Sequence, residues 1–360
     1  VCVCVCVCVR VRACVCVCAL RVRVLCVCAA CVRVPKQDSG SPAEQVDDPL
    51  LVVTFNTGTS EGVLDGAQGE GGYTAEMAAR SDAFYGDGLA WSPAVEATRD
   101  WFGRFSPDLV VFQEIFHSGE CADIPEADRA GFVCETWEDG DPTVAQVILG
   151  DHYQVACHPG KPDKCAAVHR RVGTFAGCEE AFCLEGLAGS TVDGCGSGAR
   201  VGRGTVIDAD GEPVLHLTNI HGSSGLSTDD QACRIAQIAQ VFDDLGDGSP
   251  AISPALPDVL MGDLNTDPHR FAELDLSAAE WAARVPLDPS VPRDHGMAFI
   301  SRVGEDAPLS YGGVADIDHV LADAWTGACD QLLLDPEAPH PVYSLAYFDH
   351  RPVVCELRER

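Results

Sequence analysis

Six short segments of the sequence share one feature, an apolar run that ends in a carboxylate, an amide or a histidine. They are Thr54–Asn56, Phe112–Glu114, Thr218–His221, Met261–Asn265, Asp316–His319 and Tyr347–His350. Short apolar runs bounded by polar residues are typical of buried strands. Polar groups at strand ends converge at one mouth, which is where α/β folds place their sites. We therefore expect the six segments to build one functional site.

The carboxylates and amides of these segments suit phosphate and metal chemistry. Asp263 and Asn265 are two residues apart, so in extended chain they point to one side and can contact one phosphate together. Glu114 and Asp349 supply hard oxygen ligands of the kind that Mg²⁺ prefers. The pattern predicts a phosphate site with a divalent cation beside it.

The two histidines of the set suit proton transfer. His221 and His350 are imidazoles that can exchange protons near neutral pH. Asp318, on a neighbouring strand end, can accept from one imidazole nitrogen and fix its tautomer. Each residue alone also has an ordinary structural interpretation, such as a core histidine or a solvated strand end. It is their joint occurrence that favours chemistry.

The elements that position these residues are strands alternating with helices and hairpins. We expect strands over 50–56, 108–114, 201–208, 214–220, 258–263, 316–321 and 353–357. One helix opens at Ser92-Pro93, with Ser92 as its N-cap, and another is capped by Ser227 or Thr228. A Gly-rich loop covers 57–73, and mixed sheets follow from the combination of hairpins and crossovers.

Twenty cysteines form two populations. Ten lie within residues 1–31, largely in Val-Cys repeats, and the first 20 or so residues read as a translated repeat upstream of the true start. Residues 21–35 then follow the export-signal order, basic before apolar, and Cys31 resembles a lipidated lipobox cysteine. No apolar run is long enough for a spanning helix. We expect a leader over 1–35 and a linker over 36–49.

The other ten cysteines favour disulfides in a compartment outside the cytoplasm, either secreted or in a bacterial cell envelope. Spacing alone does not fix their pairing, and Cys121/Cys134, Cys157/Cys165 and Cys178/Cys183 are the local loops we would guess. Seven of the ten lie in 117–200, which reads as an irregular, Cys-rich insertion at the mouth of the fold.

The composition is that of a globular chain with a strong negative charge. Of 360 residues 46% are hydrophobic, and the formal net charge is −31. Such a chain repels polyanions at long range, so a phosphate-bearing substrate needs local positive charge, most simply a divalent cation. Four arginines, Arg170, Arg171, Arg200 and Arg203, are candidate phosphate contacts, although solvated surface arginines are the plainer interpretation of each.

The order of these motifs resembles the endonuclease/exonuclease/phosphatase superfamily, which has the deoxyribonuclease I-like fold. The resemblance runs from about Leu50 to Leu357, and its most specific pieces are Gly262-Asp-Leu-Asn265 and Asp349-His350. It implies one α/β (α+β) domain over 50–360, a four-layer sandwich of two packed mixed β-sheets flanked by helices. It also implies in-line hydrolysis of a phosphoester with Mg²⁺, with Mn²⁺ as the alternative ion and Ca²⁺ as a candidate structural one.

The resemblance further implies a role for each site residue. Asn56, Glu114 and Asp349 lie at the metal, with Glu114 as the main ligand. Asp263 and Asn265 orient or help to deprotonate the attacking water, and they stabilise the charged phosphorane. His221 contacts the scissile phosphate and protonates the leaving oxygen, while Asp318 pairs with His350, the general base or phosphate contact. We find no acidic partner for His221 in the sequence. Thr266-Asp267 and Ile317-Asp318-His319 depart from the inositol phosphatase pattern, and His221 departs from the DNA-repair pattern.

Three functions remain open at this point. The first is an exported, monomeric endonuclease with a nucleic acid substrate. The second is a phospholipid phosphodiesterase of the sphingomyelinase type, which would need an exposed apolar contact with the membrane, and no Trp/Phe-rich hairpin stands out. The third is a non-catalytic binding module on the same fold.

Overall fold

The structure is a computed structural model, and it describes residues 6–7, 15–16, 49–59, 73–196, 200–331 and 347–360. The chain divides into two units, Val1–Val46 and Asp47–Arg360. In the first, β1 (Cys6–Val7) pairs with β2 (Val15–Cys16) in antiparallel fashion. The predicted export signal, the Cys31 lipidation site, nearly all of the linker and most of the Gly-rich loop lie outside the described residues. Among those described, no helix is both long and apolar enough to cross a membrane.

The second unit contains two mixed sheets, as the sequence predicts. In spatial order, the seven-stranded sheet holds β14 (Trp325–Gln331), β15 (Val353–Glu359), β3 (Leu50–Asn56), β4 (Leu109–Gln113), β6 (Lys161–His169), β5 (Tyr153–His158) and β8 (Phe182–Cys183). The six-stranded sheet holds β12 (Ala298–Phe299), β13 (Asp318–Ala322), β11 (Asp258–Asp263), β10 (Pro213–His221), β9 (Arg200–Ile207) and β7 (Thr174–Phe175).

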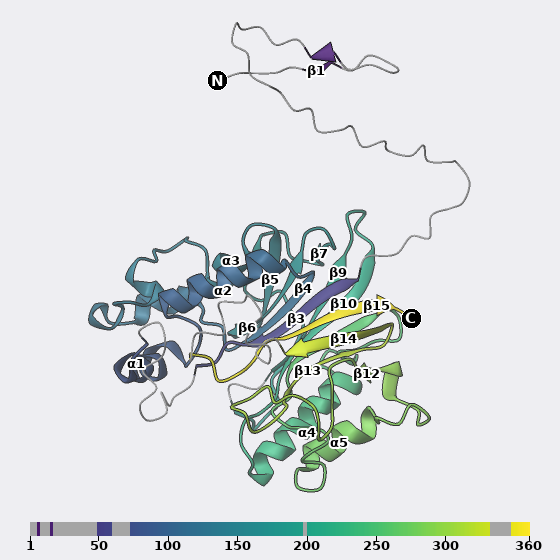
Figure 1. Cartoon of the computed structure of the whole chain (residues 1–360). Coiled ribbons are helices and arrows are strands. Elements are labelled where there is room, and N and C mark those ends of the chain that lie inside the picture. The colour runs from purple at the N-terminus through teal and green to yellow at the C-terminus, as the bar shows by residue number, and fades with distance from the viewer. Residues whose placement is uncertain (1–5, 8–14, 17–48, 60–72, 197–199, 332–346) are drawn as a thin grey trace, which may run out of the picture. The chain divides into compact units, whose positions relative to one another are not determined.

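Helices cover the outer face of each sheet, which completes a four-layer sandwich (Figure 1). The helices are α1 (Ala75–Tyr85), α2 (Ser92–Phe105), α3 (Val144–Leu149), α4 (Thr228–Phe242) and α5 (Leu276–Arg284). Short 3₁₀ turns are η1 (Ser118–Asp123), η2 (Glu126–Asp128), η3 (Val133–Glu135) and η4 (Asp294–Gly296). The first three α-helices pack on the seven-stranded sheet, and α4 and α5 pack on the other.

The apolar strand residues explain why the two sheets stack. Val52 and Val111 from one sheet and Leu217 and Met261 from the other belong to one buried cluster between the sheets. Burying each side chain of this size contributes about 1.5–3 kcal/mol relative to exposure. All five residues of β4 are buried, as expected of a strand covered on both faces. The continuous apolar runs of the sequence are therefore central strands.

Helix starts follow the expected capping chemistry at α4 and differ at α2. The Ser227 side chain accepts from the amide of Asp230, and Asp230 reaches back to Ser227, which forms a capping box. At α2 the N-cap is Trp91 rather than Ser92, without a side-chain cap, and Pro93 lies in the first turn. The predicted cap is wrong by one residue because the proline fixes a helical φ without needing the serine hydroxyl.

Residues 117–200 are less irregular than the sequence suggested. Tyr153–His158 and Lys161–His169 form the hairpin β5–β6, which is an integral part of the seven-stranded sheet. Lys161, Lys164 and Cys165 interrupt the alternation of apolar residues, so the sequence pattern did not indicate these strands. The insertion is thus confined to the turns before β5 and the short strands after β6.

Five disulfides join the ten cysteines of this unit. The three local guesses are all present: Cys121–Cys134, Cys157–Cys165 and Cys178–Cys183. The longer bridges are Cys195–Cys233 and Cys329–Cys355. The three local bridges lie within residues 117–200, Cys195–Cys233 joins this segment to α4, and Cys329–Cys355 joins β14 to β15.

Candidate active site

The ends of strands from both sheets meet at one edge. Because β3 and β4 are parallel, Asn56 and Glu114 emerge on the same side. Because β10 and β11 are parallel, His221 and Asp263 are direct neighbours in register. β13 runs antiparallel to β11, so its first residue, Asp318, lies opposite Asp263.

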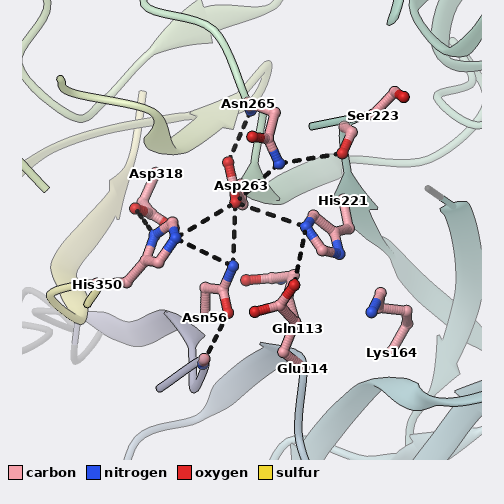
Figure 2. Close-up of polar contacts among 12 residues, drawn as sticks. Asn56, Gln113, Glu114, Lys164, His221, Ser223, Asp263, Asn265, Asp318 and His350 are labelled. Atoms are coloured by element: carbon pink, nitrogen blue, oxygen red, sulfur yellow. Dashed lines mark hydrogen bonds and ion pairs between the residues drawn. The ribbon is translucent and has the colours of Figure 1, made fainter. Parts of the chain in front are cut away.

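One cavity of about 600 Å³ collects these strand ends. Seven of the eight predicted residues line it: Asn56, Glu114, His221, Asp263, Asn265, Asp349 and His350. The eighth, Asp318, is buried and hydrogen bonded to His350. Figure 2 shows Asp263 at the centre of the group, between His350 and His221.

His350 is held by a buried carboxylate. Its Nδ1 donates to Asp318 Oδ2 over 2.8 Å, and its Nε2 lies 3.7 Å from Asp263 Oδ2. Burial alone would lower the pKa of His350, but the charges of Asp318 and Asp263 raise it to about 10. The environment therefore favours a cationic imidazolium beside Asp263.

Asp263 accepts hydrogen bonds from two amide side chains. Asn56 Nδ2 donates to Oδ2 over 3.0 Å, and Asn265 Nδ2 donates to the same atom over 3.1 Å. The Asn265 amide donates to Oδ1 over 2.7 Å, which its positive φ of 51° permits. Burial raises the pKa of Asp263 to about 7, against the lowering effect of His350. Asp263 is thereby poised to gain or lose a proton near neutral pH.

His221 meets a different environment from His350. Its Nε2 lies 3.6 Å from Asp263 Oδ2 and 3.7 Å from Glu114 Oε1. Its Nδ1 is buried without a hydrogen bond, and no carboxylate in the described part of the chain bonds to it. Burial, followed by the charge of Lys164, lowers the pKa of His221 well below 6.5. Among the described residues, the carboxylates near His221 therefore face its Nε2 and not its Nδ1.

Three side-chain oxygens lie around the position that a Cβ on Gly58 would take. A Cβ there would collide with Glu114 Oε2 and would lie 3.1 Å from Asp349 Oδ1 and 3.2 Å from Asn56 Oδ1. Asp349 Oδ1 is buried without a hydrogen-bond partner. Burial raises the pKa of Glu114 and of Asp349. Two carboxylates and one amide oxygen thus face the space beside a residue that has no side chain. Such oxygen ligands are suited to a hard divalent cation.

A second set of close ligand atoms comprises Asp263, Asp318 and His350, whose atoms lie within 4.8 Å of one another. Within this set, however, His350 Nδ1 already donates to Asp318. With its pKa raised to about 10, His350 carries a proton on both ring nitrogens near neutral pH, and a protonated nitrogen cannot ligate a metal. The three residues are joined by one hydrogen bond, from His350 to Asp318, and by one ion pair, between His350 and Asp263. The oxygens near Gly58 are the better candidates for a cation, and we call them the metal cradle.

Lys164 was not predicted from the sequence. Its side chain, on β6, is only 4% exposed, and its Nζ lies 2.6 Å from Asp163 Oδ2. The Lys164 charge opposes the burial that raises the pKa of Glu114, and it adds to the burial that lowers the pKa of His221. Figure 2 shows Lys164 on the side of the site next to these two residues. It was overlooked because β6 was expected to be irregular. The turn residue Gly160, directly before β6, was the sequence feature that could have indicated this strand.

The candidate arginines do not gather at the cavity. Arg171 donates to Asp108, which precedes β4 and so lies at the opposite end of that strand from Glu114. Arg203 binds Asp247 and the carbonyl of Pro250, and Arg170 is exposed beside Arg171. Arg200 alone is next to the site in register, opposite His221.

Solved structures share this architecture at low sequence identity. The Bacteroides thetaiotaomicron VPI-5482 mannosyl-6-phosphatase Bt3783 matches with a TM-score of 0.50 and 14% identity, over 86% of this chain and 99% of that one. An endonuclease/exonuclease/phosphatase family protein from B. thetaiotaomicron matches with a TM-score of 0.48 and 13% identity, over 86% and 94%. D. rerio TDP2, complexed with a single-strand DNA product, gives 0.49 and 11%, over 87% and 100%.

No protein-family model matches the sequence, and no curated protein does either. The similarity to the solved structures thus lies in the fold and not in the sequence. The chain shares with the mannosyl-6-phosphatase structure the α/β sandwich of two packed mixed sheets flanked by helices that the sequence predicted.

Proposed function

We propose that this protein is a divalent-metal-dependent hydrolase of phosphoester bonds. The observation that carries the proposal is the division of one cavity into two kinds of groups. The oxygens of Asn56, Glu114 and Asp349 surround Gly58, and the chain from Asp318 through His350 to Asp263 lies beside them. A binding module would not need a buried imidazolium that faces an acid of near-neutral pKa.

A bound divalent cation, held by Glu114, Asp349 and Asn56, would supply positive charge to offset the charge that builds up on the phosphoryl oxygens. The remaining steps belong to side chains of the chain itself. Asp263, with its pKa near 7, would accept a proton from the attacking water, which Asn265 helps to orient. His350 would donate to a phosphoryl oxygen, since Asp318 keeps it charged.

His221 would protonate the leaving oxygen. It is neutral without substrate, because burial and Lys164 disfavour its charged form. An anionic phosphate placed next to it would favour protonation again. The imidazolium formed in this way could give its proton to the leaving group as the bond breaks.

For the substrate we propose a phosphodiester. An endonuclease activity was the first expectation from the sequence, and Lys164 and Arg200 near His221 are consistent with a phosphate contact. The net charge of −31 disfavours extended non-specific contact with DNA. We also propose export to a secreted or cell-envelope location, which the five disulfides support.

A substrate panel tests the activity. The oxidised chain is incubated with bis(p-nitrophenyl) phosphate, plasmid DNA, RNA and phosphatidylcholine vesicles, with Mg²⁺, Mn²⁺ or chelator. We expect metal-dependent turnover that His221→Ala and Asp263→Ala reduce by about 10²-fold or more. Arg171→Ala, at the opposite end of β4, is the matched control. No turnover of any substrate would favour the non-catalytic module instead.

A further inference from the structure

The residues of the candidate active site come from two different sheets. Asn56 ends β3 and Glu114 directly follows β4, so these two members of the metal cradle belong to the seven-stranded sheet. His221 and Asp263 are the last residues of β10 and β11, in the six-stranded sheet. The two sheets must keep one relative position for these groups to act together, since a misplacement of about 1 Å can lower a rate by about 10²-fold.

Most of the contact between the two sheets is apolar. Val111 on β4 and Leu217 on β10, for example, belong to the buried cluster that lies between them. The hydrophobic effect drives the two sheets together, but it is non-directional. A hydrogen bond between the sheets has a preferred distance and angle, and it is therefore the more specific constraint on their relative position.

Gln113 and Asn219 form such a hydrogen bond. Gln113 lies two residues after Val111, and Asn219 lies two residues after Leu217, so all four face the space between the sheets. Gln113 Nε2 donates to Asn219 Oδ1 over 2.6 Å. The two side chains are 0% and 3% exposed, so no solvent competes for this bond.

Other partners fix the orientation of both amides. Asn219 Nδ2 donates to the carbonyl oxygen of Phe112 over 2.9 Å and to that of Cys165 over 3.0 Å, on β4 and β6. Both amide protons of Asn219 are thus used, and the reversed amide would set its oxygen against two carbonyls. Asn219 can therefore offer only its oxygen to Gln113. The Gln113 oxygen in turn accepts from Thr54 Oγ1 over 3.5 Å.

The amide pair lies directly before the site along both strands. Gln113 precedes Glu114 by one residue, and Asn219 precedes His221 by two (Figure 2 shows Gln113 beside Glu114). His221 Nδ1 is buried without a hydrogen bond, so the position of this ring depends on that of β10 and on its Nε2 contacts. A shift of Asn219 would consequently move His221 relative to Glu114.

We propose that Gln113 and Asn219 are positioning residues, which keep the metal cradle in register with His221 and Asp263. This inference rests on the proposed hydrolase function, because it is catalysis that requires the register. An apolar pair of the same shape could pack the two sheets about as well, since replacing both partners of a buried hydrogen bond can be nearly neutral for stability. A fully satisfied polar network instead specifies a single arrangement.

Turnover of bis(p-nitrophenyl) phosphate at saturating Mg²⁺ tests the role. Gln113→Met keeps the side-chain length but removes the bond to Asn219, so kcat should fall by about tenfold or more. The matched control is Gln154→Met, which removes three hydrogen bonds of a buried glutamine to backbone groups. Gln154 lies, through β6, level with Leu109 at the start of β4, away from the site. This control should lower Tm but keep the kcat of the unchanged chain.

An exchange of the two amides gives a second test, which does not depend on how well Gln113→Met folds. Gln113→Asn shortens one side chain by a methylene and Asn219→Gln lengthens the other, so each change alone should lower kcat. The double variant restores the combined length of the two side chains. Its kcat should exceed that of either single variant, as expected of two residues that are directly coupled.

Three results would overturn the positioning role. They are an unchanged kcat in Gln113→Met, an equal loss of kcat in Gln154→Met, and losses in the exchanged variants that simply add. A purely structural role would lower Tm in Gln113→Met and leave the kcat of the folded chain unchanged. Turnover that Gln113→Met does not slow contradicts the positioning role alone, whereas no turnover by the unchanged chain contradicts the hydrolase and the positioning role with it.

Discussion

His350 and His221 lie on either side of Asp263, and their surroundings drive them to opposite charge states. Asp318 raises the pKa of His350 to about 10, whereas burial and Lys164 lower that of His221. Two imidazoles of one residue type can thus take different roles in one cavity. The largest contribution that raises the pKa of His350 is the charge of Asp318, which also accepts the hydrogen bond from Nδ1, and the charge of Asp263 adds to it.

Removing the charge of Asp318 should remove the charge of His350. Asp318→Asn keeps the side-chain shape, so we expect an intact fold and a kcat reduced by about 10²–10⁴-fold, as when the orienting acid of a catalytic histidine is lost. Steady-state kinetics on bis(p-nitrophenyl) phosphate, with thermal unfolding as a control for folding, measure this. An unchanged kcat would show that His350 does not depend on Asp318.

Gly58 offers a test of the metal cradle that leaves every ligand in place. Gly58→Ala puts a methyl group against Glu114 Oε2 and near Asp349 and Asn56, so Mg²⁺ affinity should fall by at least about tenfold. Gly103→Ala is the matched control, since a Cβ in that part of α2 meets no atom within 4 Å. Titration calorimetry with Mg²⁺ reads the effect without turnover. Equal Mg²⁺ affinity in both variants would mean that the cation does not bind beside Gly58.

At the scale of elements, the loops around the site depend on buried polar side chains of the helices. Arg234 on α4 joins Asp275 and two loop carbonyls beneath the surface. Breaking a buried ion pair from one side leaves the other charge uncompensated. The positions of the loops after His221 and Asn265 are thus set by one side chain that contacts neither residue.

Arg234→Met should lower the free energy of unfolding by about 3 kcal/mol or more. Arg80→Met is the control, because Arg80 pairs with the exposed Glu76 on α1, and such a surface pair contributes about 0.5 kcal/mol or less. Urea unfolding of both variants provides the comparison. If both lose the same small amount, the Arg234 network is not a scaffold for the loops.

Central strands could be predicted from the sequence, and edge or interrupted elements could not. β3 and β11 match their predicted bounds because their apolar runs are continuous and end in a polar residue. β14 was not predicted, since five of its seven residues are not buried and the run carries little apolar signal. β5 and β6 were hidden by cysteine, lysine and proline, and they lie toward one edge of their sheet, where only the short β8 follows β5.

The predicted site residues share the property that made the strands visible, a polar group at the end of an apolar run. Lys164 lacks it because it lies inside a strand that was not predicted, and Gly58 lacks a side chain altogether.

For the whole molecule, stability should depend on pH through a buried acid away from the metal cradle. Asp316 Oδ1 accepts from Gln331, but its Oδ2 is buried without a partner. Burial, with the charges of Asp267 and Asp318, raises the pKa of Asp316 to about 8. The folded state therefore holds this proton more tightly than the unfolded state does, and stability is lost as the pH rises from about 4 to about 8.

Asp316→Asn removes that penalty while keeping the acceptor for Gln331. The variant should be more stable than the unchanged chain at pH 9, by about 1–3 kcal/mol, and the difference should shrink toward pH 4. Urea unfolding across this pH range measures it. A difference that stays constant with pH would mean that Asp316 titrates normally in the fold.

Metal-dependent cleavage is the central claim for the molecule as a whole, and a chelator-rescue measurement tests it most directly. Turnover of bis(p-nitrophenyl) phosphate is followed with Mg²⁺, after chelator, and after excess Mg²⁺ is restored, for the unchanged chain and for Asp263→Asn. We predict activity that chelator abolishes and Mg²⁺ restores, with Asp263→Asn slower by about 10²-fold or more at every stage. Turnover that persists in chelator, or that Asp263→Asn leaves unchanged, would contradict the account.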